Sequence, residues 1–223
     1  MSKTICVVGA GLAGALLSIY LARQGFEVQV FERRPDLRKS DISAGRSINL
    51  ALANRGLAAL GDLGLKAKVE PLLIPMKGRM VYDEHGNTNF QSYGQKPDEV
   101  IYSISRGGLN KLLMDEAEAT GNVTIHFEHR VADVDLDSKT ITCHTHDGEI
   151  LVNEFTRLIG TDGAGSQVRQ AVLAKNCQQD DISPLGHSYK ELSIPPAEGG
   201  GFSIEKEALH IWPRGGFMLI ALP

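Results

Sequence analysis

The sequence has few cysteines, little net charge and no recognisable metal-ligand pattern. Its three cysteines, Cys6, Cys143 and Cys177, are odd in number and far apart. That excludes a disulfide framework and a C-x-x-C metal pair, and it favours a reducing compartment, by default the cytoplasm. A formal charge of −4 gives no general attraction to nucleic acid or to an anionic membrane. His144 and His146 alternate on an expected strand, but no Asp, Glu or Cys pattern beside them completes a zinc site.

Long uncharged stretches are also scarce. Residues 5–22 carry no charge and follow Lys3, so this stretch could be a signal peptide or a membrane span. Three glycines inside it have the spacing of a nucleotide-binding turn, which favours a strand, a turn and a helix instead. No other stretch of the sequence is a membrane candidate. With 42% apolar and 22% charged residues among 223, the composition is that of a globular protein with one large domain or two small ones.

The first 32 residues have the order of a dinucleotide-binding unit. Residues 4–8 are apolar and β-branched, which predicts a buried parallel strand. Gly9, Gly11 and Gly14 follow at G-x-G-x-x-G spacing. We expect them to provide, in that order, a tight turn, close approach of a pyrophosphate and close packing of a helix on the strand.

A helix and a second strand complete this unit. Small and apolar residues recur in helical register up to Ala22, and Gly25 stands where a helix C′ residue belongs. Residues 27–31 predict a strand that ends at Glu32, 23 residues after Gly9, where an acid can accept a hydrogen bond from a ribose hydroxyl. Backbone N–H groups at the helix N-terminus would hold the pyrophosphate. The motif does not distinguish FAD from NAD(P), and a glycine-rich turn in an ordinary α/β unit is the alternative.

The rest of the chain alternates between strand and helix patterns. Helical spacing is found at residues 52–63 and 106–120, and Ser166 can cap a helix that runs to about residue 173. A polar linker covers residues 174–186. Strand patterns occupy residues 76–83, 88–93, 100–104, 123–127, 130–135, 140–146, 149–155, 158–161, 187–194, 202–204, 209–212 and 217–222.

The order of these elements predicts an α/β protein in which a Rossmann-like nucleotide-binding fold is interleaved with an antiparallel substrate-covering sheet. We assign residues 1–72 to the first part of the nucleotide-binding domain and residues 73–104 to a hairpin insertion. Residues 105–175 form its second part, with a β-meander and an Asp-Gly loop, and residues 176–223 begin the substrate sheet. The last four strand patterns are expected to be antiparallel.

Local motifs resemble the flavin-dependent aromatic hydroxylases. The stretch RLIGTDGAGS, with a following Arg169, is similar to the Asp-Gly fingerprint of that family, which contacts FAD and the incoming NADPH. Further signatures resemble the members of the family that hydroxylate L-kynurenine, and the resemblance runs over residues 5–223. These signatures are GRSINLAL, MKGRM, YSISRGGLN, SYKEL and LHIWPRG.

The resemblance implies an FAD-dependent monooxygenase of tryptophan degradation. It would convert L-kynurenine to 3-hydroxykynurenine with NADPH and O2, without a catalytic side chain, because the flavin carries the chemistry. Arg79 and Tyr93 match the pair that binds the substrate carboxylate, for which an arginine and a hydroxyl donor are suited. The implied cofactor-binding residues are Gly9, Gly11, Leu12, Ala13, Gly14, Glu32, Arg33, Arg34, Arg46, Arg106, Asp162 and Gly163.

Several of these residues also have plainer interpretations. Arg79 can be a surface arginine and Tyr93 a packing or turn residue. Arg106 begins the helix at 106–120, where a cation is unfavourable unless a phosphate is bound, but it can also be exposed or ion-paired. Asp162 can form an Asx turn or a helix cap. Arg46 can form a loop salt bridge.

The family's members continue with a Gly-Asp motif and further substrate contacts, and some have a membrane-associated segment. We therefore expect this chain to be an N-terminal portion. The alternatives are another FAD- or NAD(P)-dependent oxidoreductase of the same fold, and a fragment that binds nucleotide without turnover.

Overall fold

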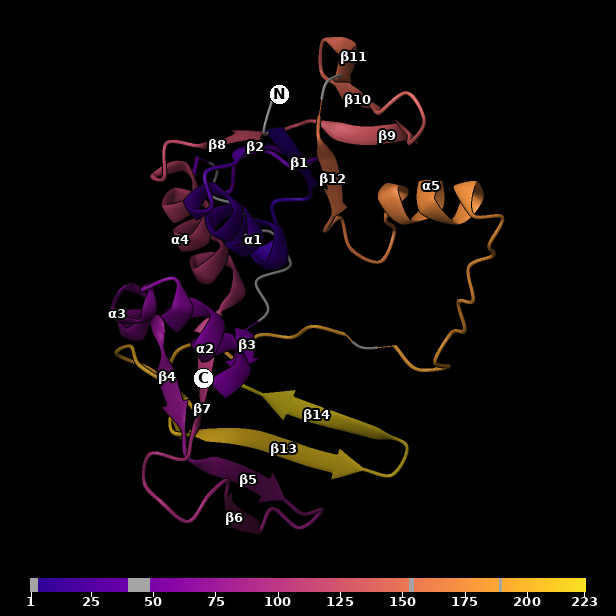
Figure 1. Cartoon of the computed structure of the whole chain (residues 1–223). Coiled ribbons are helices and arrows are strands. Elements are labelled where there is room, and N and C mark those ends of the chain that lie inside the picture. The colour runs from indigo at the N-terminus through magenta and orange to yellow at the C-terminus, as the bar shows by residue number, and fades with distance from the viewer. Residues whose placement is uncertain (1–3, 40–48, 153–154, 189) are drawn as a thin grey trace. The chain divides into compact units, whose positions relative to one another are not determined.

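A computed structural model describes residues 4–39, 49–152, 155–188 and 190–223 (Figure 1). Contacts divide the chain into two units. The first comprises residues 1–44 and 110–188, and the second comprises residues 45–109 and 189–223. The sequence placed the first boundary at residue 72, whereas the structure groups residues 45–72 with the second unit.

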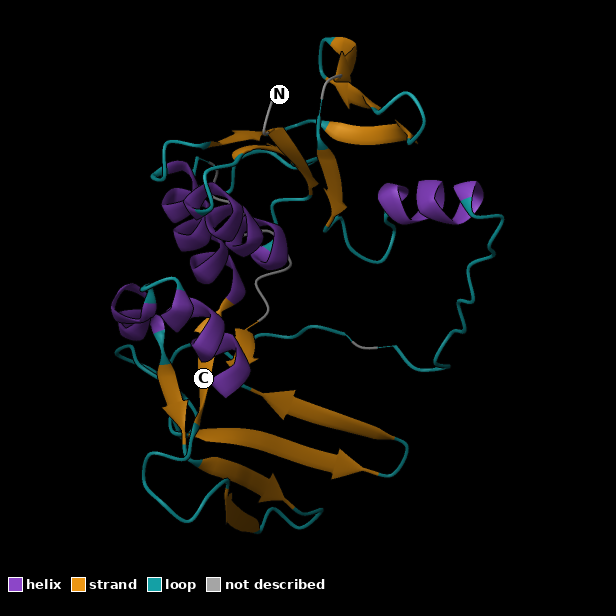
Figure 2. Ribbon diagram, viewed as in Figure 1, coloured by secondary structure: helices purple, strands orange, loops and turns teal. Residues whose placement is uncertain are grey.

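The first unit is built on a four-stranded parallel sheet. Its order is β12 (Arg157–Gly160), β1 (Thr4–Val8), β2 (Glu27–Phe31) and β8 (Val123–His126). Helix α1 (Leu12–Arg23) contacts three of these strands, β1, β2 and β8. This arrangement confirms the strand–turn–helix–strand order expected for the start of the chain (Figure 2).

Small residues allow α1 to lie close to the sheet. Gly14, Ser18 and Ala22 are buried and recur every four residues, so they share one face of the helix. The helix ends where Gly25 adopts a φ of +81°, and its N–H donates to Ala22 O at 2.9 Å. A glycine relieves the strain of this left-handed conformation, as the sequence predicted.

A second sheet and α5 (Gln167–Lys175) complete the core of the first unit. The antiparallel strands β9 (Arg130–Asp135), β10 (Thr140–Thr145) and β11 (Gly148–Val152) form the expected β-meander. One buried cluster joins side chains from both sheets and from α5. Its members are Cys6, Val8, Phe31, Val131, Val134, Ile141, Cys143, Phe155 and Val168.

The second unit contains two further sheets. One has the order β14 (Phe217–Ala221), β13 (Ala208–Arg214), β5 (Gly78–Tyr82) and β6 (Thr88–Ser92). The other has the order β3 (Asn49–Leu52), β7 (Ile101–Ser105) and β4 (Ile74–Met76). Its helices are α2 (Asn54–Asp62), α3 (Lys66–Val69) and the short 3-10 helix Glu70–Leu72. Helix α4 (Arg106–Glu118) begins in the second unit and continues in the first.

The prediction of an α/β fold with interleaved antiparallel strands is confirmed, but three details of the last strands are wrong. The described residues of 187–194 are not a strand, and neither are residues 202–204. Leu192, Ile194 and Phe202 are exposed, so their apolar side chains find no sheet to cover. In addition, β13 pairs with β5 in parallel and only with β14 in antiparallel orientation. Among the described residues, no helix is long and apolar enough to cross a membrane.

Candidate functional site

The glycine turn between β1 and α1 is packed too tightly for larger residues at two of its three glycines. Gly9 has a φ of +97°, and a Cβ there would lie 2.7 Å from Thr161 O. A Cβ on Gly14 would lie 1.9 Å from Gly9 O. The expected roles of Gly9 in a tight turn and of Gly14 in close packing therefore match the geometry.

Gly11 differs from the other two glycines. Its φ of −69° is ordinary for any residue, and a Cβ built on it meets no atom within 4 Å. Neither strain nor packing inside the described protein therefore calls for glycine. Gly11 is also the N-cap of α1 and, as a glycine, supplies no side-chain hydrogen bond to the start of the helix. Leu12 and Ala13 are the first two residues of that helix. The turn thus offers open space beside a helix N-terminus, which is where an anionic group is stabilised.

The carboxylate of Glu32 is hydrogen-bonded to the backbone of this turn. Its Oε2 accepts a hydrogen bond from Ala10 N at 2.8 Å, and its Oε1 accepts from Arg34 N and Nε at 3.0 and 2.8 Å. The carboxylate is buried, which by itself would raise its pKa. The hydrogen bonds and charge of Arg34, with the Ala10 N–H, outweigh burial and lower the pKa of Glu32. The group is therefore an ionised acceptor at neutral pH.

The loop after β2 is held by an arginine that the sequence did not single out. The Arg38 guanidinium bonds Asp36 through Nε–Oδ1 at 2.8 Å and Nη2–Oδ2 at 2.9 Å. Its Nη1 donates to Asp115 at 3.0 Å and to Glu118 at 2.5 Å, both on α4. These bonds fix the segment that carries the expected ligands Arg33 and Arg34, which are both exposed.

The Asp-Gly loop lies directly against the glycine turn. A Cβ on Gly9 would come within 3.1 Å of Asp162 Cα, and the Thr161 hydroxyl lies 2.8 Å from Gly9 O. The Asp162 carboxylate accepts from Ser166 Oγ at 2.6 Å and from Gln167 N at 2.8 Å. It therefore caps the start of α5 together with Ser166, which corresponds to the plainer of its two interpretations.

Gly163 follows Asp162 in a left-handed conformation, with a φ of +82°, and it is exposed. The structure brings together Gly9, Glu32 and Asp162, which come from distant parts of the sequence. Their roles as ligands remain predictions.

Two residues of this region were missed by the sequence interpretation. Asn110 on α4 donates from Nδ2 to Ala10 O at 3.1 Å, and Thr161 bonds the turn as described above. For Thr161 the signal was its position immediately before Asp162. Asn110 lies four residues after Arg106 in a helical pattern, and a lone polar residue at a buried position could have been noticed there.

Arg79 and Tyr93 lie together in the second unit. The Arg79 guanidinium carbon lies 5.3 Å from the centre of the Tyr93 ring, within the range of a cation–π contact. The Tyr93 hydroxyl is buried and has no hydrogen-bond partner among the described residues. Arg79 is exposed on β5. A cation and an unsatisfied hydroxyl donor side by side suit a carboxylate ligand.

The structure says little about the remaining two expected ligands, Arg106 and Arg46. Arg106 is the first residue of α4, as predicted, and it is exposed. Arg46 lies outside the residues that the structure describes. In the described part of the chain, no group of three or more His, Cys, Asp or Glu side chains could hold a metal ion.

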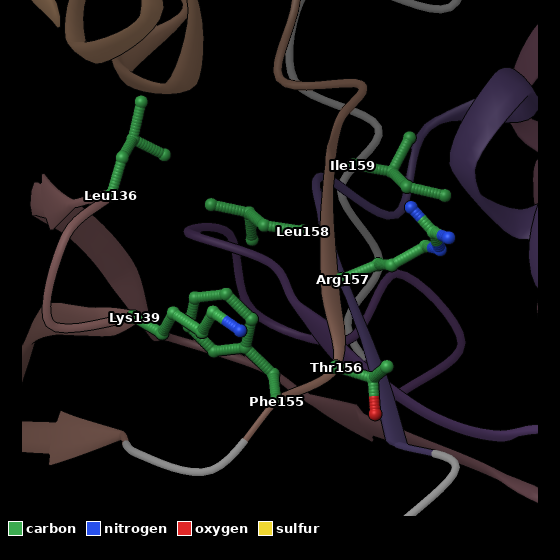
Figure 3. Close-up of a pocket in the computed structure, with 7 residues that line it drawn as sticks. All are labelled: Leu136, Lys139, Phe155, Thr156, Arg157, Leu158 and Ile159. Atoms are coloured by element: carbon green, nitrogen blue, oxygen red, sulfur yellow. The ribbon is translucent and has the colours of Figure 1, made fainter.

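A separate cavity of about 450 Å³ opens beside β12. Leu158 is directed to the side of Leu136, whereas Arg157 and Ile159 are directed to the other side of the strand (Figure 3). Phe155, Thr156 and Lys139 complete the lining. None of the expected ligands belongs to this set, so the candidate site is the glycine turn and not this cavity.

Residues 2–192 match the family described as FAD binding domain. The chain is also 50% identical, over 221 residues, to kynurenine 3-monooxygenase of Myxococcus xanthus DK1622, covering 99% of this chain and 48% of that protein. It is 47% identical, over 223 residues, to kynurenine 3-monooxygenase of Stenotrophomonas maltophilia K279a, covering 49% of it. The chain therefore spans about half the length of the curated relatives it matches.

Solved structures show the same fold. The p-nitrophenol 4-monooxygenase PnpA of Pseudomonas putida DLL-E4 matches with a TM-score of 0.64 at 21% identity, over 77% of this chain and 44% of that one. PqsL of P. aeruginosa, in complex with 2-aminobenzoylacetate, matches with a TM-score of 0.60 at 25% identity, over 83% and 48%. These matches confirm the expected aromatic-hydroxylase type of FAD-binding fold.

Proposed function

Because the chain belongs to the FAD binding domain family, we propose that it provides the FAD site and part of the substrate site of a monooxygenase that hydroxylates L-kynurenine. The observation that carries this proposal is the identity of 50% and 47% to two relatives named kynurenine 3-monooxygenase, over nearly the whole chain. The balanced reaction converts L-kynurenine, NADPH, a proton and O2 to 3-hydroxykynurenine, NADP+ and water. FAD, when bound, supplies the redox chemistry that side chains lack.

The glycine turn has the space and the polarity to receive the pyrophosphate of FAD. The vacant volume beside Gly11 lets phosphate oxygens approach the backbone, and the start of α1 provides N–H groups and a favourable dipole. Leu12 and Ala13 contribute through their backbone, so their side chains are free to differ. Arg33, Arg46 and Arg106 are proposed to add positive charge near the phosphates.

Glu32 is proposed to bind the ribose of FAD. Its four contacts include one long bond, from Arg34 Nη2 at 3.2 Å. The Arg34 side chain is half exposed, with 48% of its surface accessible, and can move away. A ribose hydroxyl can then donate to the ionised carboxylate in place of Nη2, without loss of the Ala10 contact. Asp162 and Gly163 are proposed to face the cofactor through the backbone of their loop, because the Asp162 carboxylate caps α5.

Arg79 and Tyr93 are proposed to bind the amino-acid carboxylate of L-kynurenine. The guanidinium supplies charge, and the buried Tyr93 hydroxyl gains a hydrogen bond that no described residue gives it. Kynurenine carries a 2-aminobenzoyl group, as does the 2-aminobenzoylacetate bound to the structural neighbour PqsL. Holding the carboxylate would orient the aromatic ring, so that oxygen is delivered to the carbon beside the ring amine.

Titration of the purified chain with FAD and then with ligands tests the proposal. We expect retained flavin absorbance after desalting, and a change in the flavin spectrum on addition of L-kynurenine. The same compound without its carboxylate should have a much smaller effect, because Arg79 and Tyr93 would have no partner. Under 18O2 with NADPH, one labelled oxygen should appear in 3-hydroxykynurenine.

Each alternative has its own result in this experiment. Stable FAD binding without a response to L-kynurenine would favour another oxidoreductase of this fold. FAD binding with a response to L-kynurenine but no labelled product would favour a chain that binds its ligands without turnover. A protein that retains no flavin would contradict the proposed FAD site in this chain.

A further inference from the structure

Asn110 of α4, the last residue of the YSISRGGLN signature, is a buried polar residue that is not among the expected ligands. It is 5% exposed, and its Nδ2 donates to Ala10 O at 3.1 Å. Its Oδ1 is also buried and has no hydrogen-bond partner among the described residues. A leucine, whose side chain has the same number of non-hydrogen atoms, would not leave an unsatisfied buried oxygen, so packing does not account for the amide. The donor that reaches Ala10 is the feature that an apolar residue would lack.

Ala10 is fastened at both of its backbone polar groups. Its N–H donates to Glu32 Oε2 at 2.8 Å, and its carbonyl accepts from Asn110. The peptide between Ala10 and Gly11 is trans, because the described chain has no cis peptide bond. In a planar trans peptide the C=O and the following N–H point in opposite directions. The Asn110 bond therefore determines where the Gly11 N–H points.

Gly11 makes such a restraint necessary. Glycine populates conformations that other residues avoid, so the peptide before it can rotate at little cost. A Cβ at Gly11 would meet no neighbouring atom, so no packing contact at this Cα adds to the restraint that the Asn110 bond provides. Without the Asn110 bond, the Gly11 N–H could turn away from the open space beside the turn.

We propose that Asn110 is a positioning residue of the nucleotide site, which holds the Ala10–Gly11 peptide so that the Gly11 N–H is available to an anionic phosphate. This inference rests on the proposed FAD site. The proposed role of Asn110 requires only its bond to Ala10 O and no contact with the pyrophosphate. It acts through the orientation of one backbone amide.

Asn110→Asp provides the sharpest test, because it keeps the shape of the side chain and replaces the donor by an acceptor. At pH 7.5 the carboxylate would repel the Ala10 carbonyl, and we expect FAD to bind about tenfold more weakly, the effect of losing one buried hydrogen bond. Burial raises the pKa of such a carboxyl. Towards pH 5 it becomes protonated and can donate again, so binding should recover.

Two further variants separate this effect from general damage. Asn110→Leu has no donor at any pH, so its FAD affinity should stay low across the same range. Asn122→Asp introduces the same charge at an exposed position of the first unit and should bind FAD like the unchanged chain. Glu32 also binds Ala10, but its lowered pKa keeps it ionised over this range. Recovery that is specific to Asn110→Asp would support the proposal, whereas equal affinity of all variants would overturn it.

The Gly11 amide signal in an NMR spectrum decides the inference without relying on FAD affinity. In the ligand-free chain, Asn110→Asp should shift this signal at pH 7.5 and return it towards its original position near pH 5. In the unchanged chain, one Asn110 side-chain proton should be protected from exchange. An unprotected Asn110 amide would overturn the inference even if the variants failed to fold. A chain that binds no FAD but shows both signatures would contradict the proposed FAD site and still support the positioning role.

Discussion

Gly14 lies so close to the carbonyl oxygen of Gly9 that a Cβ added to it would be 1.9 Å from that oxygen. The first turn of α1 thus packs directly against the backbone of the turn before it. Gly11, between them in the sequence, has no such neighbour. The three glycines of one motif therefore meet different physical demands, and substitutions should separate them.

Gly14→Ala should reduce stability, whereas Gly11→Ala should reduce FAD affinity. Gly14→Ala forces the backbone apart and should lower the free energy of unfolding by about 1–3 kcal/mol or prevent folding. Gly11→Ala should leave the melting temperature nearly unchanged but weaken FAD binding, because its methyl group enters the space proposed for the pyrophosphate. Thermal melts and FAD titration would measure both. Normal FAD affinity in Gly11→Ala would contradict the proposed position of the cofactor.

Glu32→Gln should destabilise the chain in a pH-dependent way. The folded pKa of Glu32 lies below its ordinary value of about 4.3, so its stabilising contribution is complete above that pH. The contribution is lost as the pH falls through the lowered folded pKa. At pH 7 we expect the variant to lose about 1–3 kcal/mol of unfolding free energy, since the donors of Ala10 and Arg34 lose an ionised acceptor.

The difference between this variant and the unchanged chain should therefore shrink as the pH falls from about 5 to 2. Urea unfolding at several pH values measures it. Glu27→Gln, at the exposed start of the same strand, is the matched control and should show no comparable pH dependence. A constant difference between Glu32→Gln and the unchanged chain would show that the charge of Glu32 is not what stabilises the turn.

The sequence predicted the first unit well because its signals are local. A β-branched run, glycines at fixed spacing and a strand ending in Glu32 each follow from the chemistry of neighbouring residues. Residues 187–194 were wrongly predicted as a strand because the apolar pattern that suggested it includes Leu192 and Ile194, which are exposed. Whether an apolar pattern forms a strand depends on a partner strand, and sequence spacing does not reveal that partner.

The sequence predicted those site residues that belong to a motif of fixed spacing. It did not predict residues whose role depends on a contact with a distant part of the chain. Glu32 was expected at the turn from its spacing. Arg38 and Asn110 were not, because the α4 partners of Arg38 lie 77 and 80 residues away in the sequence and the partner of Asn110 lies 100 residues away. Asp162 illustrates a further limit: the motif located it, but only the structure shows that its carboxylate caps α5.

Arg38→Met should loosen the segment that follows β2. The change leaves the buried Asp36 carboxylate without its bidentate partner and breaks both bonds to α4. We expect a loss of about 1–3 kcal/mol in unfolding free energy. Arg23→Met, which removes an exposed arginine at the end of α1, should cost only a few tenths of a kcal/mol. Equal stabilities of the two variants would show that the Arg38 network contributes little.

The three cysteines should differ sharply in reactivity. Burial raises the pKa of the Cys6 thiol to about 11, with a smaller effect of Cys143, and burial raises the pKa of Cys143 to about 11. Cys177 is exposed. At pH 8 iodoacetamide should therefore label Cys177 in the native chain and all three cysteines in urea. Rapid native labelling of Cys6 or Cys143, read by peptide mass spectrometry, would show that the core of the first unit opens readily.

Tyr93→Phe and Tyr82→Phe form a matched pair within the second unit. The Tyr82 hydroxyl bonds His210 Nδ1 at 2.9 Å, while His210 Nε2 donates to Glu205 O at 2.7 Å. His210 is fully buried, so Tyr82→Phe leaves His210 Nδ1 without its hydrogen-bond donor. This should cost about 1–3 kcal/mol of unfolding free energy. The Tyr93 hydroxyl has no partner in the described structure, so Tyr93→Phe should leave stability unchanged or slightly higher.

Ligand binding should reverse this order. If the Tyr93 hydroxyl donates to the carboxylate of L-kynurenine, Tyr93→Phe should weaken binding about tenfold, whereas Tyr82→Phe should bind normally once folded. Melting temperatures and L-kynurenine titrations of both variants measure the two quantities separately. A Tyr93→Phe variant that loses stability but keeps its affinity would assign Tyr93 a packing role. Unchanged stability together with weaker binding of L-kynurenine would place the substrate carboxylate at the Tyr93 hydroxyl. In that case the hydroxyl, which has no partner among the described residues, would be needed for the ligand and not for the fold.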